Sequence, residues 1–127
     1  MPFERWNRAL SLVDYGRALR RIERGNLAAG QNLLRRAIAR SGDWPIHPHI
    51  LLAKSFAFEH RFDLVLRKAA EITEIVDRLP QLNQPTRDYI RYYVYRLLPE
   101  NPPVPVPLKK DRIYLPRLIV EHFGLTY

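Results

Sequence analysis

The chain has 127 residues, the length of one ordinary domain, and its apolar share of 46% is enough for a hydrophobic core. The lack of cysteine excludes disulfides, thiolate metal sites and cysteine nucleophiles, and no apolar run approaches the roughly 18 residues of a membrane span. Because 21 Lys and Arg oppose 13 Asp and Glu, giving a net charge of +8, and because no apolar signal stretch opens the chain, we expect a cytoplasmic protein with an anionic partner.

The N-terminal region predicts a helix that begins at a capping motif. Ser11 and Asp14 are three residues apart, as in a capping box, in which a hydroxyl and a carboxyl group bind backbone donors of the first turn. The apolar residues that follow at steps of three and four define the predicted core face: Leu12, Tyr15, Leu19 and Ile22. Trp6, Leu10 and Val13 lie on roughly the opposite face, which predicts either a short separate helix or a first helix packed on both sides.

A second helix is predicted between two glycines. Gly25 ends the first helix, Asn26 can cap the next one, and that helix stops near Gly42. The residues expected to face the core are Leu27, Leu33, Leu34, Ala37 and Ile38.

Three further helices follow a turn at residues 43–48, where two prolines disfavour helix. The third, over residues 48–60, is expected to bury Leu51, Leu52, Phe56 and Phe58. The fourth begins with Asp63 as its cap and runs to about Leu79, with inward residues Leu66, Ala69, Ala70 and Ile72 to Val76. The fifth opens at Pro85 and ends before Pro99, with inward residues Ile90, Tyr93, Val94 and Leu97.

A proline-rich segment separates these helices from the C-terminus. Residues 99–108 predict an extended polyproline-like strap, and a docking ligand for an aromatic groove is the alternative. Residues 109–127 are expected to form a last helix that packs back on the bundle. The sequence therefore predicts an all-α protein: one domain over 1–127, a single compact bundle of five or six helices with its main part at 1–98.

Four arginines of the first helix form the main candidate binding surface. Arg17, Arg20, Arg21 and Arg24 lie within about a third of the helix circumference, opposite the predicted core face. Further candidates on the second helix are Arg35, Arg36 and Arg40. Because a guanidinium group binds phosphate in a bidentate manner, this pattern predicts nucleic-acid binding. A solvated helix face and an acidic protein partner are the alternatives.

A second candidate surface combines arginine and tyrosine within residues 86–96. Guanidinium planes and rings side by side suit single-stranded nucleic acid, so we expect Tyr89, Tyr92 and Tyr95 to stack on unpaired bases. Half-buried tyrosines with wet hydroxyls are the alternative. The nucleic-acid-binding residues predicted here and just after the strap are Arg87, Arg91, Tyr92, Arg96, Lys109 and Lys110.

No residue pattern is typical of a catalytic or metal site. Only His47 and His49 form even a weak metal-binding pair, and there is no His-Glu-x-x-His spacing or Gly-rich phosphate loop. Carboxylates at three-residue steps beside basic residues predict a salt-bridged exposed face: Glu71, Glu74 and Asp77 with Arg67, Lys68 and Arg78. We therefore expect a protein that is not an enzyme and uses no metal or cofactor.

Residues 11–79 contain an internal similarity with a period of 35 residues. The equivalent positions are Gly25, Gly30, Leu34 and Ala37 in the first unit and His60, Val65, Ala69 and Ile72 in the second. Small or apolar residues at this spacing resemble two tetratricopeptide-like hairpins. His60 in place of glycine, and Arg21 where the second unit has Phe56, depart from that pattern. The resemblance implies, as an alternative function, a protein–protein interaction adaptor.

As a whole, the chain is similar to the small subunits of CRISPR effector complexes, which are compact, basic, cysteine-poor helical proteins of this size. The residues that carry the similarity are Arg17, Arg20, Arg21, Arg24, Arg35, Arg36 and the segment 87–96. It implies a non-catalytic subunit of an antiviral ribonucleoprotein that binds the backbone of single-stranded guide or target RNA or DNA without sequence preference. Expected partners are other subunits, copies of the chain included, and no membrane.

Overall fold

The computed structural model describes residues 2–99, which form five helices and no strand. The helices are α1 (Pro2–Glu23), α2 (Leu27–Ser41), α3 (His47–Phe58), α4 (Phe62–Arg78) and α5 (Gln84–Tyr95). The predicted all-α bundle is confirmed. The strap beyond Pro99, the predicted last helix, Lys109 and Lys110 lie outside the described residues.

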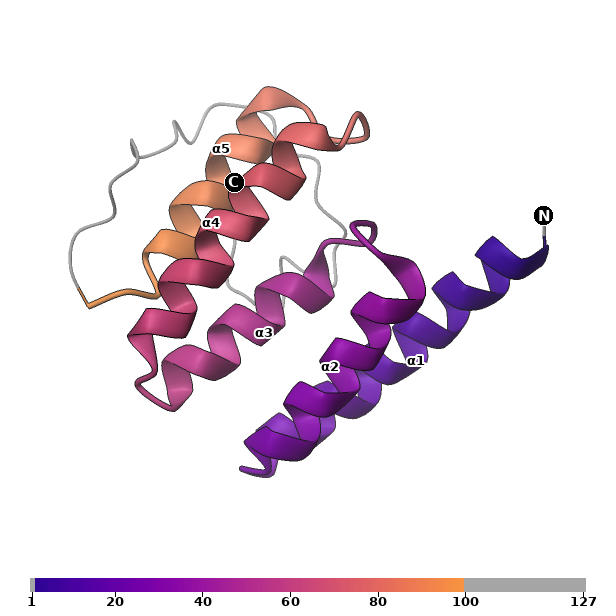
Figure 1. The fold of residues 1–127 in the computed structure, drawn as a ribbon, viewed down its shortest axis with the longest axis horizontal. Coiled ribbons are helices and arrows are strands. Elements are labelled where there is room, and N and C mark those ends of the chain that lie inside the picture. Colours follow the sequence, from indigo (N-terminus) through magenta and orange to yellow (C-terminus); the bar gives the residue numbers. More distant parts are fainter. Residues whose placement is uncertain (1, 100–127) are drawn as a thin grey trace.

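Each described helix packs mainly against its neighbours in the chain (Figure 1). α1 and α2 lie side by side as an antiparallel hairpin, α3 follows along α2, and α4 and α5 form the other end of the array. Every helix contributes a fully buried side chain to one core: Tyr15, Leu34, Ile50, Ile72 and Ile90. None of the described helices has the length and apolar character needed to cross a membrane.

The turns that close the α1–α2 and α3–α4 hairpins have the same geometry. Gly25 (φ 83°) and His60 (φ 56°) both adopt the left-handed conformation. Two backbone bonds follow in each turn, as in a Schellman motif: Gly25 to Ile22 (2.9 Å) and Asn26 to Arg21 (2.8 Å), then His60 to Ala57 (3.0 Å) and Arg61 to Phe56 (3.0 Å). The period of 35 residues therefore corresponds to two hairpins that are closed by turns of the same geometry.

Equivalent positions of the two hairpins are also buried alike. Leu34 and Ala37 on α2 and their counterparts Ala69 and Ile72 on α4 are fully buried. Gly30 corresponds to Val65, but at Gly30 an added Cβ would lie 2.6 Å from Cγ1 of Ile22, so α1 and α2 approach closely there.

The predicted helix start at Ser11 is wrong, because α1 runs continuously from Pro2 to Glu23. The hydroxyl of Ser11 instead donates to the carbonyl of Ala37 at 3.1 Å, and the side chain of Asp14 faces α2. These two polar residues occupy the face that the sequence assigned to Leu12, whose side chain is exposed. Asn26 does cap α2, since its Oδ1 accepts from the backbone N–H of Ala29.

Three predicted core residues beyond α1 are also wrong. Phe58, Leu66 and Ala70 are exposed. Asp63 lies in the first turn of α4, while the N-cap position belongs to Arg61. Periodicity identified the helices correctly but not the width of each buried face, which depends on the helix packed against it.

Candidate nucleic-acid interface

The arginine ridge consists of Arg17, Arg20 and Arg21 on α1 and Arg24 just after it. All four side chains are exposed, on the side of α1 away from the buried Ala18 and Ile22. Among the described side chains, none of the four has a carboxylate within the 4.0 Å of an ion pair. Four adjacent guanidinium groups repel one another, so an anion bound here would lower the free energy of the ridge.

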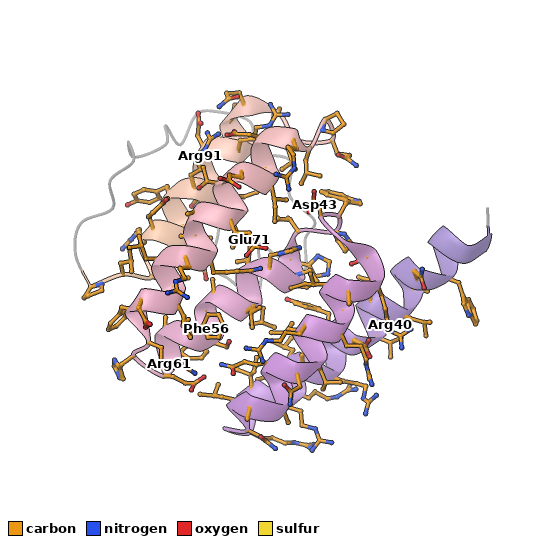
Figure 2. All side chains as sticks on the ribbon, in the orientation of Figure 1. Arg40, Asp43, Phe56, Arg61, Glu71 and Arg91 are labelled. Atoms are coloured by element: carbon orange, nitrogen blue, oxygen red, sulfur yellow. The ribbon has the colours of Figure 1, made fainter. Side chains whose placement is uncertain are left out.

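Asp14 explains why two other predicted arginines are not part of this surface. Its carboxylate is almost fully buried and lies 2.9 Å from Nη2 of Arg36 and 3.1 Å from Nε of Arg40. Figure 2 labels Arg40 where α2 lies beside α1. The hydrogen bonds that Arg36 donates to Asp14, together with the negative charge of Asp14, raise the pKa of Arg36. Both arginines therefore hold α2 to α1, and their role in the structure is intramolecular.

Arg35 is exposed but lies apart from the ridge. Its Nη1 donates to Oδ1 of Asn32 at 3.4 Å. Burial lowers the pKa of Lys68 on α4, and the charge of Arg35 adds to that shift. It is a separate exposed cation.

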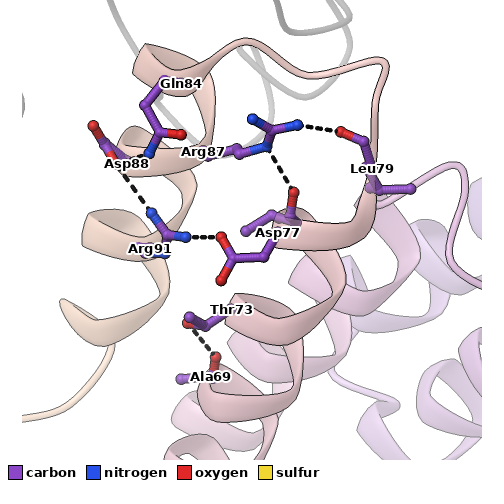
Figure 3. A network of polar contacts seen from close by, with 9 residues as sticks. Ala69, Thr73, Asp77, Leu79, Gln84, Arg87, Asp88 and Arg91 are labelled. Carbon is purple, nitrogen blue, oxygen red and sulfur yellow. Dashed lines mark hydrogen bonds and ion pairs between the residues drawn. The ribbon is translucent and has the colours of Figure 1, made fainter.

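Two arginines of the second predicted surface, Arg87 and Arg91, join α5 to α4 (Figure 3). Arg87 donates from Nε to the carbonyl of Val76 at 2.9 Å and from Nη2 to that of Leu79 at 2.7 Å, so it caps the C-terminal end of α4. Arg91 forms ion pairs with Asp77 on α4 and, at 3.0 Å, with Asp88 on its own helix. The structure thus engages both guanidinium groups within the chain.

The tyrosines of α5 are partly buried. Tyr89, Tyr93 and Tyr95 pack against the core. This agrees with the alternative interpretation, in which these tyrosines are half-buried residues of the bundle. The ring of Tyr92 lies 5.4 Å from the guanidinium carbon of Arg96, which is exposed. Of this surface, Tyr92 and Arg96 are the predicted pair that the structure brings together toward solvent.

Sequence reasoning missed a buried polar cluster beneath α2. Lys68, predicted on an exposed face, is buried, and its Nζ lies 3.0 Å from Nδ1 of His49 and 3.1 Å from Oε2 of Glu71. Because an ammonium group only donates, Nδ1 of His49 accepts, and its Nε2 donates to the carbonyl of Gly42 at 2.9 Å. Burial first, and then the charge of Lys68, lower the pKa of His49. His49 is thus a neutral link between α2, α3 and α4.

His47, the other half of the predicted metal pair, packs edge-on against Tyr15 with ring centres 4.4 Å apart. Burial, with a smaller effect of His49, lowers its pKa to about 4. Neither ring nitrogen has a hydrogen-bond partner among the described residues. The same residues contain no group of three or more His, Asp or Glu that could hold a metal ion.

The arginine ridge is thus the largest group of exposed cations on one described helix face that has no internal partner. Comparisons of the chain with protein-family models, with curated proteins and with solved structures found no match.

Proposed function

We propose that the protein is a non-catalytic subunit of a larger ribonucleoprotein that binds the nucleic-acid backbone through the arginine ridge. One observation carries the proposal: the four ridge arginines are exposed on one face and have no ion-pair partner among the described side chains, although the same chain engages other arginines internally. Arg36, Arg40, Arg87 and Arg91 are engaged in this way. Arg61 and Arg78 also form exposed ion pairs, with Glu59 and Asp43. An unbalanced row of guanidinium groups favours a polyanion.

Binding would follow from phosphate neutralisation. Each guanidinium group that pairs with a phosphate releases condensed counterions, which supplies affinity without reading the base sequence. Arginine suits this role because its planar donors can contact two phosphate oxygens at once. The ridge therefore supports sequence-independent binding.

The proposed setting is a CRISPR-type effector complex in the cytoplasm, where the subunit would stabilise guide or target strands beside other protein subunits. Its support is the basic character of the chain and the all-helical structure of its described residues, together with the position of the ridge on an outer helix. The ridge alone does not distinguish RNA from DNA, so both are tested.

The test compares two variants with the same change in net charge. The ridge variant carries Arg17→Glu, Arg20→Glu and Arg24→Glu, and the control variant carries Arg61→Glu, Arg67→Glu and Arg78→Glu on exposed positions at α4. Fluorescence anisotropy would measure binding to labelled oligo(dT) and oligo(U) of about 16 nucleotides. We expect the ridge variant to bind at least about 100-fold more weakly, since three charged contacts are lost.

The control variant should retain most of the affinity, and both variants should keep the helical circular dichroism of the parent. Arg78 and Arg20 both lie in the last turn of a helix, so both substitutions act on a helix end. Arg78→Glu also removes the exposed ion pair with Asp43, so the circular dichroism of the control variant checks that it stays folded. Equal affinity of the ridge variant and the unmodified chain would refute the proposal.

The alternative function is a tetratricopeptide-like adaptor for protein partners. It is favoured by the two equivalent hairpins, with their shared turn at Gly25 and His60 and their matched buried positions. Retention of a specific polypeptide by the immobilised chain at about 0.15 M salt, together with no retention of either oligonucleotide, would favour the adaptor.

A further inference from the structure

The outer face of α1 is apolar and aromatic along its first half and basic along its second. Trp6 and Val13 are 66% and 56% exposed, and Arg17 and Arg20 follow them on the same side. At 100° per residue, all four lie within about 60° of one another, opposite the buried Ala18. The sequence predicted that a first helix could be packed on a second side through Trp6, Leu10 and Val13. In the structure, Trp6 and Val13 on that side are exposed to solvent.

This face belongs to an edge of the described array. α1 packs on α2 and touches α3, and its N-terminal turns extend past the end of α2 (Figure 1). Ser11 already lies opposite Ala37 and Ser41 in the last turns of α2, so Trp6 is on the extension. A tryptophan ring on such an extension has no role in the described core.

Trp6 is also the aromatic side chain most available for stacking in the described part of the chain. The tyrosines of α5 are partly buried, Tyr15 is fully buried, and Phe58, the other largely exposed ring, lies 5.8 Å from Nζ of Lys54. The stacking that the sequence assigned to tyrosines is thus better supplied by Trp6, which shares its face with the arginine ridge.

The spacing and shape of this face favour a single strand. Arg17, Arg20 and Arg24 are separated by about 4.5 and 6 Å along the helix axis, more than the axial rise of roughly 3.4 Å per phosphate of one duplex strand, so they suit a strand whose bases are unstacked. A partner helix could cover Trp6 and Val13, but only an acidic one would also neutralise the ridge arginines. A nucleotide strand needs no groove, because its bases can stack on one ring while its phosphates meet cations.

We infer that the outer face of α1 binds single-stranded nucleic acid in one continuous path, with an unpaired base stacked on Trp6 and the adjoining phosphates on Arg17, Arg20 and Arg24. This inference rests on the proposed function and adds to it the strandedness of the ligand and the residue that selects it. A duplex keeps its bases stacked internally, so it would use the arginines but not Trp6.

Intrinsic fluorescence tests this contact directly, because Trp6 and Trp44 are the two tryptophans of the chain. In a Trp44→Phe background, Trp6 is the remaining tryptophan, and we expect its emission to be quenched by unlabelled oligo(dT) but not by a duplex or by heparin. Trp6→Ala should weaken oligo(dT) binding by about 5- to 150-fold and leave heparin and duplex binding unchanged. Trp6→Phe should recover part of the lost affinity because it keeps a ring.

The outcomes separate this inference from the proposed function. If the ridge variant loses oligo(dT) binding but Trp6→Ala does not, the backbone-binding function stands and the stacking contact is refuted. If the unmodified chain binds neither oligo(dT) nor heparin, both fail. Quenching of Trp6 by an acidic amphipathic peptide but not by oligo(dT) would overturn the inference in favour of a protein partner.

Discussion

Asp14 shows how one buried side chain decides which cations this molecule presents to its surroundings. Its carboxylate lies against Arg36 and Arg40, so two of the seven arginines predicted on the first two helices serve the contact between them. Residues that pair across helices cannot be recognised from spacing along one helix. The sequence therefore overestimated the basic surface on α2 while correctly identifying the exposed side of α1.

A single buried residue, His47, also affects the stability of the fold in acid. Its pKa is lowered in the fold from 6.5 to about 4, mainly by burial, so the unfolded chain takes up the proton first as the pH falls. The contribution of neutral His47 to stability is complete above about pH 6.5 and is lost toward pH 4. Because protonation of buried His47 is unfavourable, we expect the free energy of unfolding to be roughly 3 kcal/mol lower at pH 4 than at pH 7 on account of this residue. Urea denaturation followed by circular dichroism would measure the difference.

His47→Phe is the matched variant for this prediction. It keeps a ring beside Tyr15 but cannot be protonated, and it removes two ring nitrogens that have no partner among the described residues. The variant should therefore lose less stability than the parent between pH 7 and pH 4. An identical acid dependence of the two chains would show that other groups account for the loss.

At the scale of elements, local signals located the helices and tertiary contacts determined their faces. Gly25 and Asn26 end one helix and begin the next as predicted, because both act through their own backbone and side chain. Leu12 and Leu66 were assigned to the core and are exposed, because the facing helix, absent from any local pattern, decides how much of each face is covered. The cap that Arg87 provides for α4 was missed for the same reason.

The close approach of α1 and α2 predicts opposite effects for two glycine substitutions. At Gly30 an added Cβ would lie 2.6 Å from Cγ1 of Ile22 and 3.2 Å from the carbonyl oxygen of Ala18, so the helices must separate. At Gly16, also within a helix, an added Cβ meets nothing within 4 Å. We expect Gly30→Ala to cost about 1–3 kcal/mol and Gly16→Ala to gain about 0.5–1 kcal/mol.

Urea denaturation of the two variants checks this difference. The gain in helix propensity is the same for both substitutions. The difference between their free energies of unfolding therefore reports the contact between α1 and α2 alone. Stabilisation of the chain by Gly30→Ala would mean that the two helices are not held at the distance seen in the structure.

For the whole molecule, the fold could be predicted more fully than the distribution of unpaired charge on its surface. Five helices and the equivalence of two hairpins follow from patterns within a few residues of each position. The distribution of charge cannot be predicted in this way, because the net charge of +8 does not say which cations form ion pairs within the chain. The ridge near Arg20 and the paired Arg91 look alike in the sequence, and the difference that no local pattern shows is Asp77 of α4, which the fold brings to Arg91.

Salt dependence distinguishes binding by the ridge from attraction by the net charge of the whole molecule. If about three to five phosphates are neutralised, the logarithm of affinity for single strands should fall with the logarithm of salt concentration with a slope of roughly −2 to −4. The ridge variant loses three contacts and should flatten this slope by about 2, whereas the control variant should keep it although both lower the net charge from +8 equally. The slopes come from anisotropy titrations at several salt concentrations. Equal flattening in both variants would mean that the strand responds to the overall charge, since only a localised interface makes the position of each arginine matter.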